Sequence, residues 1–71
     1  MDIRIIKKIH EFISTERTGS PKELSNKLCI SERTVYNYIS YMKMEMDAPI
    51  VFDMQKGNYF YHRPCLLIFK G

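Results

Sequence analysis

A line of polar side chains recurs between residues 32 and 46 of this 71-residue chain. Arg33, Asn37 and Ser40 are spaced three to four residues apart, so on a helix they fall on one face. An arginine guanidinium donates hydrogen bonds in pairs, and an asparagine amide both donates and accepts. The chemistry that this spacing indicates is recognition of another molecule by directed hydrogen bonds.

Groups that do covalent or metal chemistry are sparse in the sequence. His10 and His62 have no cysteine, aspartate or glutamate partner at metal-ligand spacing. Cys29 and Cys65 form no second pair, which fits neither a zinc ribbon nor a disulfide framework and predicts two reduced thiols. The sequence contains no nucleophile motif and no glycine-rich phosphate loop. We therefore predict no enzymatic activity, no metal, no cofactor and no small-molecule substrate.

The positive charge of the chain is concentrated in its middle third. The formal net charge is +3, from 11 Lys and Arg against 8 Asp and Glu, and all of this excess lies in residues 17–43. Such a local basic segment can steer and position a polyanion. No apolar run approaches the roughly 18 residues of a membrane span, and the N-terminus lacks the core of a signal peptide. We expect a cytoplasmic protein with no membrane partner.

Three helices are expected to position the polar face. Residues 3–15 repeat apolar side chains at the spacing of a wide helix face, and Asp2 can cap their start. This apolar face comprises Ile5, Ile6, Ile9, Phe12 and Ile13. Ser20 and Glu23 form a capping box, with a proline at the first helical position, which predicts a second helix over residues 21–28.

The third helix is expected over residues 32–46, with Ser31 as its cap. Its buried stripe contains Val35, Ile39, Met42 and Met46. The polar residues Arg33, Asn37 and Ser40 lie opposite that stripe. The helix therefore has one face for the core and one for a partner.

The pattern changes beyond Pro49, where β-branched and aromatic residues flank a polar turn that ends in Gly57. This change predicts a β-hairpin over residues 50–62. The apolar segment 65–69 is predicted to form either a third strand or an edge that faces a partner. The chain is thus expected to be one α+β domain over residues 1–71, mainly α with a small hairpin.

Residues 24–36 read Leu-Ser-Asn-Lys-Leu-Cys-Ile-Ser-Glu-Arg-Thr-Val-Tyr and resemble a known signature, L-A-x-x-L-G-I-S-x-R-T-V. That signature belongs to winged helix-turn-helix domains of the DeoR-like and biotin-repressor-like type. Residues 48–50 and 57–59 are similar to the wing of that family, and the resemblance covers residues 5–61. It implies three helices followed by a two- or three-stranded wing, with a short strand near Thr18 pairing with the hairpin.

Two positions depart from the family pattern. Ser25 stands where the family usually has alanine, and Cys29 stands where it usually has glycine. If the turn requires a positive φ, Cys29 carries strain of roughly 1 kcal/mol or more.

The resemblance implies sequence-specific binding of double-stranded DNA by a small prokaryotic transcriptional regulator, with the third helix in the major groove. The candidates for reading bases are Arg33, Tyr36, Asn37 and Ser40. The candidates for contacting phosphates are Ser20, Lys22, Ser31, Thr34, Tyr41 and Lys56. Further partners are a second copy, forming a homodimer, or a separate effector-sensing chain.

Alternatives to DNA binding stay open at this point. Winged helices also serve as protein–protein interaction modules, and three of the five tyrosines lie on the predicted third helix, where exposed aromatics suit a protein interface. RNA binding is a further option. The apolar end fits either a finished small protein, which we favour, or the N-terminal part of a longer regulator.

Overall fold

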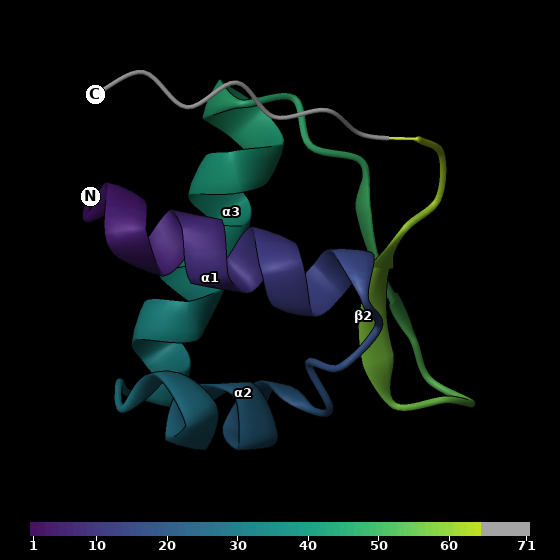
Figure 1. Ribbon diagram of the computed structural model, residues 1–71, viewed down its shortest axis with the longest axis horizontal. Coiled ribbons are helices and arrows are strands. Elements are labelled where there is room, and N and C mark those ends of the chain that lie inside the picture. Colours follow the sequence, from purple (N-terminus) through teal and green to yellow (C-terminus); the bar gives the residue numbers. More distant parts are fainter. Residues whose placement is uncertain (65–71) are drawn as a thin grey trace.

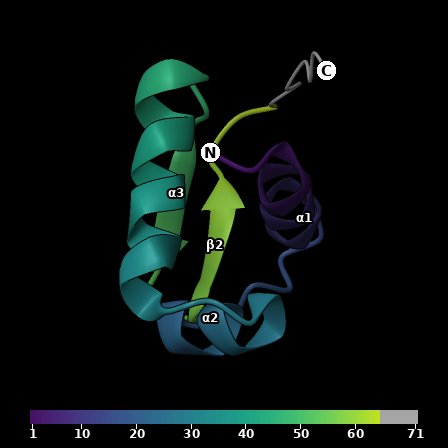
Figure 2. The ribbon, with the colours of Figure 1, turned by 90° about the vertical axis from the view of Figure 1, so that its left-hand side faces the viewer.

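The computed structural model describes residues 1–64, so the predicted strand at 65–69 lies outside the described residues. The elements are, in order, α1 (Ile3–Ser14), α2 (Pro21–Leu28), α3 (Glu32–Glu45), β1 (Ile50–Asp53) and β2 (Asn58–Tyr61) (Figure 1). α1 and α3 lie on opposite sides, with β2 between them and α2 across one end (Figure 2). The predicted α+β winged-helix architecture is confirmed.

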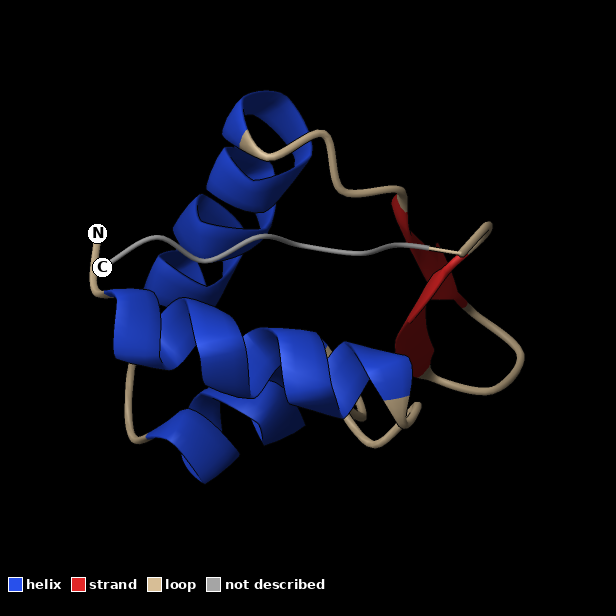
Figure 3. Ribbon diagram, turned by 45° about the horizontal axis from the view of Figure 1, so that its top comes forward, coloured by secondary structure: helices blue, strands red, loops and turns tan. Residues whose placement is uncertain are grey.

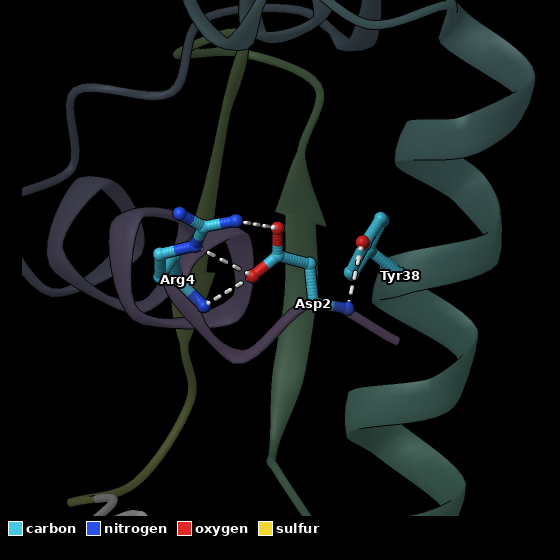
Figure 4. Close-up of polar contacts among 3 residues, drawn as sticks. All are labelled: Asp2, Arg4 and Tyr38. Carbon is cyan, nitrogen blue, oxygen red and sulfur yellow. Dashed lines mark hydrogen bonds and ion pairs between the residues drawn. The ribbon is translucent and has the colours of Figure 1, made fainter.

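Each helix begins at a cap that its local sequence supplies. The Asp2 carboxylate accepts a hydrogen bond from Arg4 N at 2.9 Å, and the Ser20–Glu23 capping box is formed at the start of α2. The backbone N–H of Asp2 also donates to the Tyr38 hydroxyl at 3.1 Å, which ties the start of α1 to α3 (Figure 4). The Arg4 guanidinium bonds to Asp2 and holds the pKa of that carboxyl below its ordinary value of 3.8.

The core forms where the inner faces of the three helices meet the inner face of the hairpin. The residues of largest volume that are fully buried are Ile9, Ile13, Leu24, Met42, Val35 and Thr18. Ser25 is 5% exposed, so a small side chain stands where α2 packs closely. Met46, expected in the buried stripe, is only partly buried because α3 ends at Glu45 and Met46 is its C-cap.

All three helices end near a non-glycine residue in the left-handed region. Cys29 has φ 57 and ψ 42, so the conformation that the resemblance implied for this turn is present. Glu16 and Asp47, each with φ 53, were not expected to adopt it. At α1 and α2 the residue that follows the left-handed one donates its backbone N–H to a carbonyl in the last turn of the helix. Arg17 N donates to Phe12 O, and Ile30 N donates to Ser25 O.

The hairpin is a two-stranded antiparallel sheet in the described part of the chain, beside the C-terminal end of α1 (Figure 3). Its register pairs Ile50 with Tyr61 and Asp53 with Asn58. β2 ends one residue before the predicted boundary, and His62 N donates instead to Pro49 O. The inner ring pair, Phe52 and Tyr59, packs edge-on with centroids 4.9 Å apart.

The predicted strand near Thr18 is wrong, because residues 17–19 form no strand. Gly19 is left-handed, with φ 68, and this interrupts an extended run. Thr18 meets β2 with its side chain instead of its backbone, since Thr18 Oγ1 accepts a hydrogen bond from Tyr59 N at 2.8 Å. A side-chain contact thus replaces the expected ladder.

Candidate nucleic-acid interface

The outer face of α3 carries the predicted hydrogen-bonding side chains. Arg33, Asn37 and Ser40 are exposed, whereas Val35 and Ile39 are buried on the opposite side. Among residues 1–64, none of the three polar side chains has a hydrogen bond or ion pair with another residue. Their donors and acceptors are therefore open to another molecule.

Two tyrosines and a methionine flank this face. Tyr36 is 52% exposed, Tyr41 37% and Met44 81%. Burial raises the pKa of the Tyr59 hydroxyl above 10.0, and the proximity of Tyr36 raises it further.

Hydroxyl groups at the starts of α2 and α3 already serve as helix caps. Ser31 Oγ accepts from Thr34 N at 3.1 Å and lies 2.9 Å from Thr34 Oγ1. Ser20 Oγ accepts from Glu23 N at 3.2 Å, and Glu23 Oε1 accepts from Ser20 N at 3.5 Å. Capping therefore explains these serines without a ligand, although an oxygen that caps a helix keeps a further hydrogen-bonding position.

The two lysines predicted to contact phosphates lie on different elements, α2 and the hairpin turn, along the same edge of the molecule. Lys22 is exposed in the first turn of α2, and Lys56 is exposed in the hairpin turn. α2, the start of α3 and the hairpin turn all lie along the lower edge of Figure 1. Lys56 Nζ is 3.9 Å from Glu16 Oε1, so an acidic side chain partly offsets its charge.

One exposed lysine of the basic segment is bonded to the backbone of a neighbouring loop, which its charge alone did not indicate. Lys27 Nζ donates to Arg17 O and lies 3.5 Å from Thr18 O. The same ammonium is 5.5 Å from the centre of the Phe12 ring. Part of the positive charge in residues 17–43 therefore holds a loop and is not presented on α3.

Sequence reasoning left out one exposed lysine on α3. Lys43 follows Tyr36 by seven residues, so it lies about two turns further along the same side of the helix. The same helical spacing that selected Arg33, Asn37 and Ser40 would have found it. It is the second cationic side chain of α3, and it lies in the last turn of that helix.

Within residues 1–64, no group of three or more His, Cys, Asp or Glu side chains is placed to hold a metal ion. None of the described helices has the length and apolar character needed to cross a bilayer.

The chain is similar to one protein family. Residues 4–59 match a family model described as an HTH domain. The matched span runs from the second residue of α1 to Tyr59 in β2, so it covers nearly all of α1, the whole of α2, α3 and β1, and the start of β2. Neither a curated protein nor a solved structure matches the chain.

Proposed function

The chain belongs to the DNA-binding helix-turn-helix domain family, and on that premise we propose that it reads a specific sequence of double-stranded DNA and regulates transcription. In this proposal α3 enters the major groove and the hairpin turn lies against the neighbouring backbone. The observation that carries the proposal is the outer face of α3. Its polar side chains are exposed and recur every three to four residues, so they share one face of the helix. They form no hydrogen bond or ion pair with other residues within 1–64.

Arg33 and Asn37 are the proposed base-reading residues of this face. Arginine pairs with guanine O6 and N7, and asparagine pairs with adenine N6 and N7, each through two hydrogen bonds. They lie four residues apart and so present their groups from successive turns of α3. Tyr36 and Ser40 flank them and contact the neighbouring bases, including the apolar methyl group of thymine.

Lysines and helix starts supply the proposed backbone contacts. Lys22 and Lys56 pair with phosphates, and the first turns of α2 and α3 present backbone N–H groups beside Ser20, Ser31 and Thr34. In this proposal the Tyr41 hydroxyl donates a hydrogen bond to a phosphate from the flank of α3 opposite Tyr36. About four to six such contacts per subunit predict a log–log salt slope of about −4 to −5.

The test is selection from pooled random duplexes, followed by titration of the enriched duplex at several salt concentrations. We expect enrichment of a short motif and an affinity that falls steeply with salt. Arg33→Ala should weaken binding to that motif. Lys8→Ala is the matched control, because it also removes one exposed positive charge but from α1, a helix that lies across the molecule from α3 (Figure 2). No enrichment and no salt dependence at low salt would contradict DNA binding.

A second candidate function is a protein-interaction module, favoured by the exposed Tyr36, Tyr41 and Met44 on α3. It predicts a partner whose binding changes little with salt and survives Arg33→Ala. The two proposals therefore give opposite results in the same titration. A homodimer on a repeated half-site is a further proposal, and it predicts a selected motif with two copies at a fixed spacing.

A further inference from the structure

The segment between α1 and α2 is bonded to the start of β2 by side chains. Thr18 is fully buried, and its Oγ1 accepts from Tyr59 N at 2.8 Å. One residue further on, Gly19 N donates to Asn58 Oδ1 at 2.8 Å. Two consecutive loop residues therefore meet two consecutive residues of the strand, which gives the contact a defined direction.

The opposite side of the same segment is held by α2. Lys27 Nζ donates to the carbonyl of Arg17 and also lies 3.5 Å from that of Thr18. We call Arg17, Thr18, Gly19, Lys27 and Asn58 the wing joint. Through it, the helix-turn-helix unit and the hairpin are bonded to one short piece of chain.

The joint lies close to the hairpin turn that carries Lys56. Asn58 Nδ2 lies 3.4 Å from Lys56 O and donates to it, so one side chain links Gly19 N to the backbone of that lysine. The other end of β2 is attached elsewhere, since Tyr61 Oη lies 2.7 Å from His10 Nδ1. Apolar packing of the inner hairpin face is not directional, whereas these hydrogen bonds at the two ends of β2 are.

We propose that the wing joint sets the angle of the hairpin relative to α3 and thereby places Lys56 for contact with a phosphate. Only the phosphate contact rests on the proposed DNA binding; the control of the angle does not. Thr18, Lys27 and Asn58 are positioning residues in this proposal. They act on a partner through the hairpin, while Arg33 acts through α3.

The angle is tested in the free protein, with residual dipolar couplings of backbone amides fitted separately for β1–β2 and for α2–α3. In the wild type both parts should share one alignment tensor. In Asn58→Ala the couplings of the hairpin should shrink, or the tensor fitted to them should rotate. The couplings of α2–α3 should stay unchanged, which also shows that the variant is folded. An unchanged shared tensor in Asn58→Ala overturns the proposal.

Two further variants sharpen this test. Asn58→Asp keeps the Oδ1 acceptor for Gly19 N and should restore the shared tensor; a hairpin as loose as in Asn58→Ala would overturn the assigned contact. Lys27→Met removes the ammonium but keeps an apolar stem near Phe12, and should loosen the hairpin in the same direction as Asn58→Ala. A hairpin unmoved by Lys27→Met would remove Lys27 from the joint and contradict the proposal as stated.

The phosphate contact is tested with a double-mutant cycle on the selected duplex. Lys56→Ala should weaken binding severalfold in the wild type and have no effect in Asn58→Ala, whereas the loss caused by Arg33→Ala should be equal in both backgrounds. An equal loss from Lys56→Ala in both backgrounds overturns the positioning role. If the wild type binds no duplex at all, the proposed function fails, and the dipolar couplings alone decide the role of the joint.

Discussion

The outer face of α3 and the wing joint are both polar, but their polar groups are used in opposite ways. Arg33, Asn37 and Ser40 are exposed and bond to no other residue within 1–64. Thr18 is fully buried, and its hydroxyl accepts from Tyr59 N and donates to Gly19 O. Paired polar groups fix the fold, while unpaired polar groups on a rigid helix are left for another molecule.

The charges divide in the same way. All three of Lys22, Lys27 and Arg33 are exposed, but only the side chain of Lys27 is bonded to other residues within 1–64, namely to loop carbonyls. The comparison therefore predicts that substitutions in the joint change stability or the hairpin angle. Substitutions on the α3 face should change binding and leave stability nearly untouched.

The largest expected effect is on stability, at Thr18. Thr18→Val keeps the size of the side chain but leaves Tyr59 N–H buried without its acceptor. We expect the free energy of unfolding to fall by about 1–3 kcal/mol, the usual cost of an unsatisfied buried donor. Urea denaturation measures this change, and Thr18→Ser, which keeps the hydroxyl, is the control. A loss in Thr18→Ser without a loss in Thr18→Val would mean that packing of the threonine methyl group, not the hydrogen bond, is what matters.

The next effect is on binding, at Asn37. Asn37→Ala should weaken binding to the selected duplex about tenfold, within the range for a bidentate base contact. Stability should stay equal or rise slightly, because alanine is the better helix former at an exposed position. Fluorescence anisotropy and thermal melting of the same samples measure both quantities. If Asn37→Ala lost stability and affinity together, the outer face of α3 would not differ from the wing joint in its contribution to stability.

A smaller effect is expected at Cys29, which lies between the two regions in the turn before α3. Its φ of 57 suits glycine, so Cys29→Gly should stabilise the fold by about 1 kcal/mol. For a domain of this size the melting temperature should rise by about 4–8 °C. Cys29→Ala keeps the strained conformation and is the control. Equal melting temperatures for the glycine and alanine variants would show that the turn stores no strain.

These residues also show how far the sequence predicts the structure. The caps at Ser20 and Ser31 and the exposed face of α3 were predicted correctly, because capping and helical periodicity act within a few residues. The αL turn at Cys29 came from the family resemblance. Glu16 and Asp47 adopt the same conformation without a local signal, since neither residue type favours it strongly enough to be read from sequence.

The wing joint could not be predicted from local patterns. Thr18 and Tyr59 are 41 positions apart, and nothing in either segment specifies that a threonine hydroxyl takes the place of a strand. Lys27 was counted as part of a basic patch, because a charge count does not tell an exposed ammonium from one bonded to carbonyls. The roles assigned to Arg33, Asn37 and the phosphate-contacting residues stay predictions.

His10 extends the comparison to the far end of β2, where it lies 2.7 Å from Tyr61 Oη. Burial lowers the pKa of His10 below 6.5, and the nearby Glu11 offsets part of this change. The unfolded chain therefore takes up the proton first, so the stability that neutral His10 contributes is present above about pH 6.5 and is lost as the pH falls below it. Melting curves from pH 8 to pH 5 should show a smaller acid-induced loss for His10→Gln than for the wild type. Identical pH profiles would show that this end of the wing does not sense protonation.

The smallest expected effect is at the ion pair between Glu16 and Lys56, which joins the loop after α1 to the hairpin turn. The two side chains are 54% and 66% exposed and their charged atoms are 3.9 Å apart, so the pair adds little to stability. Its effect on binding should be of the opposite sign, because Glu16 competes with a phosphate for Lys56 and also repels the phosphate. Glu16→Gln should therefore strengthen binding to the selected duplex by up to about threefold at low salt, and the gain should fade as salt screens the charges. Glu11→Gln, which removes an exposed carboxylate from α1, is the matched control and should give a smaller gain. Equal gains in the two variants would trace the effect to net charge, and would remove Lys56 from the proposed backbone contacts.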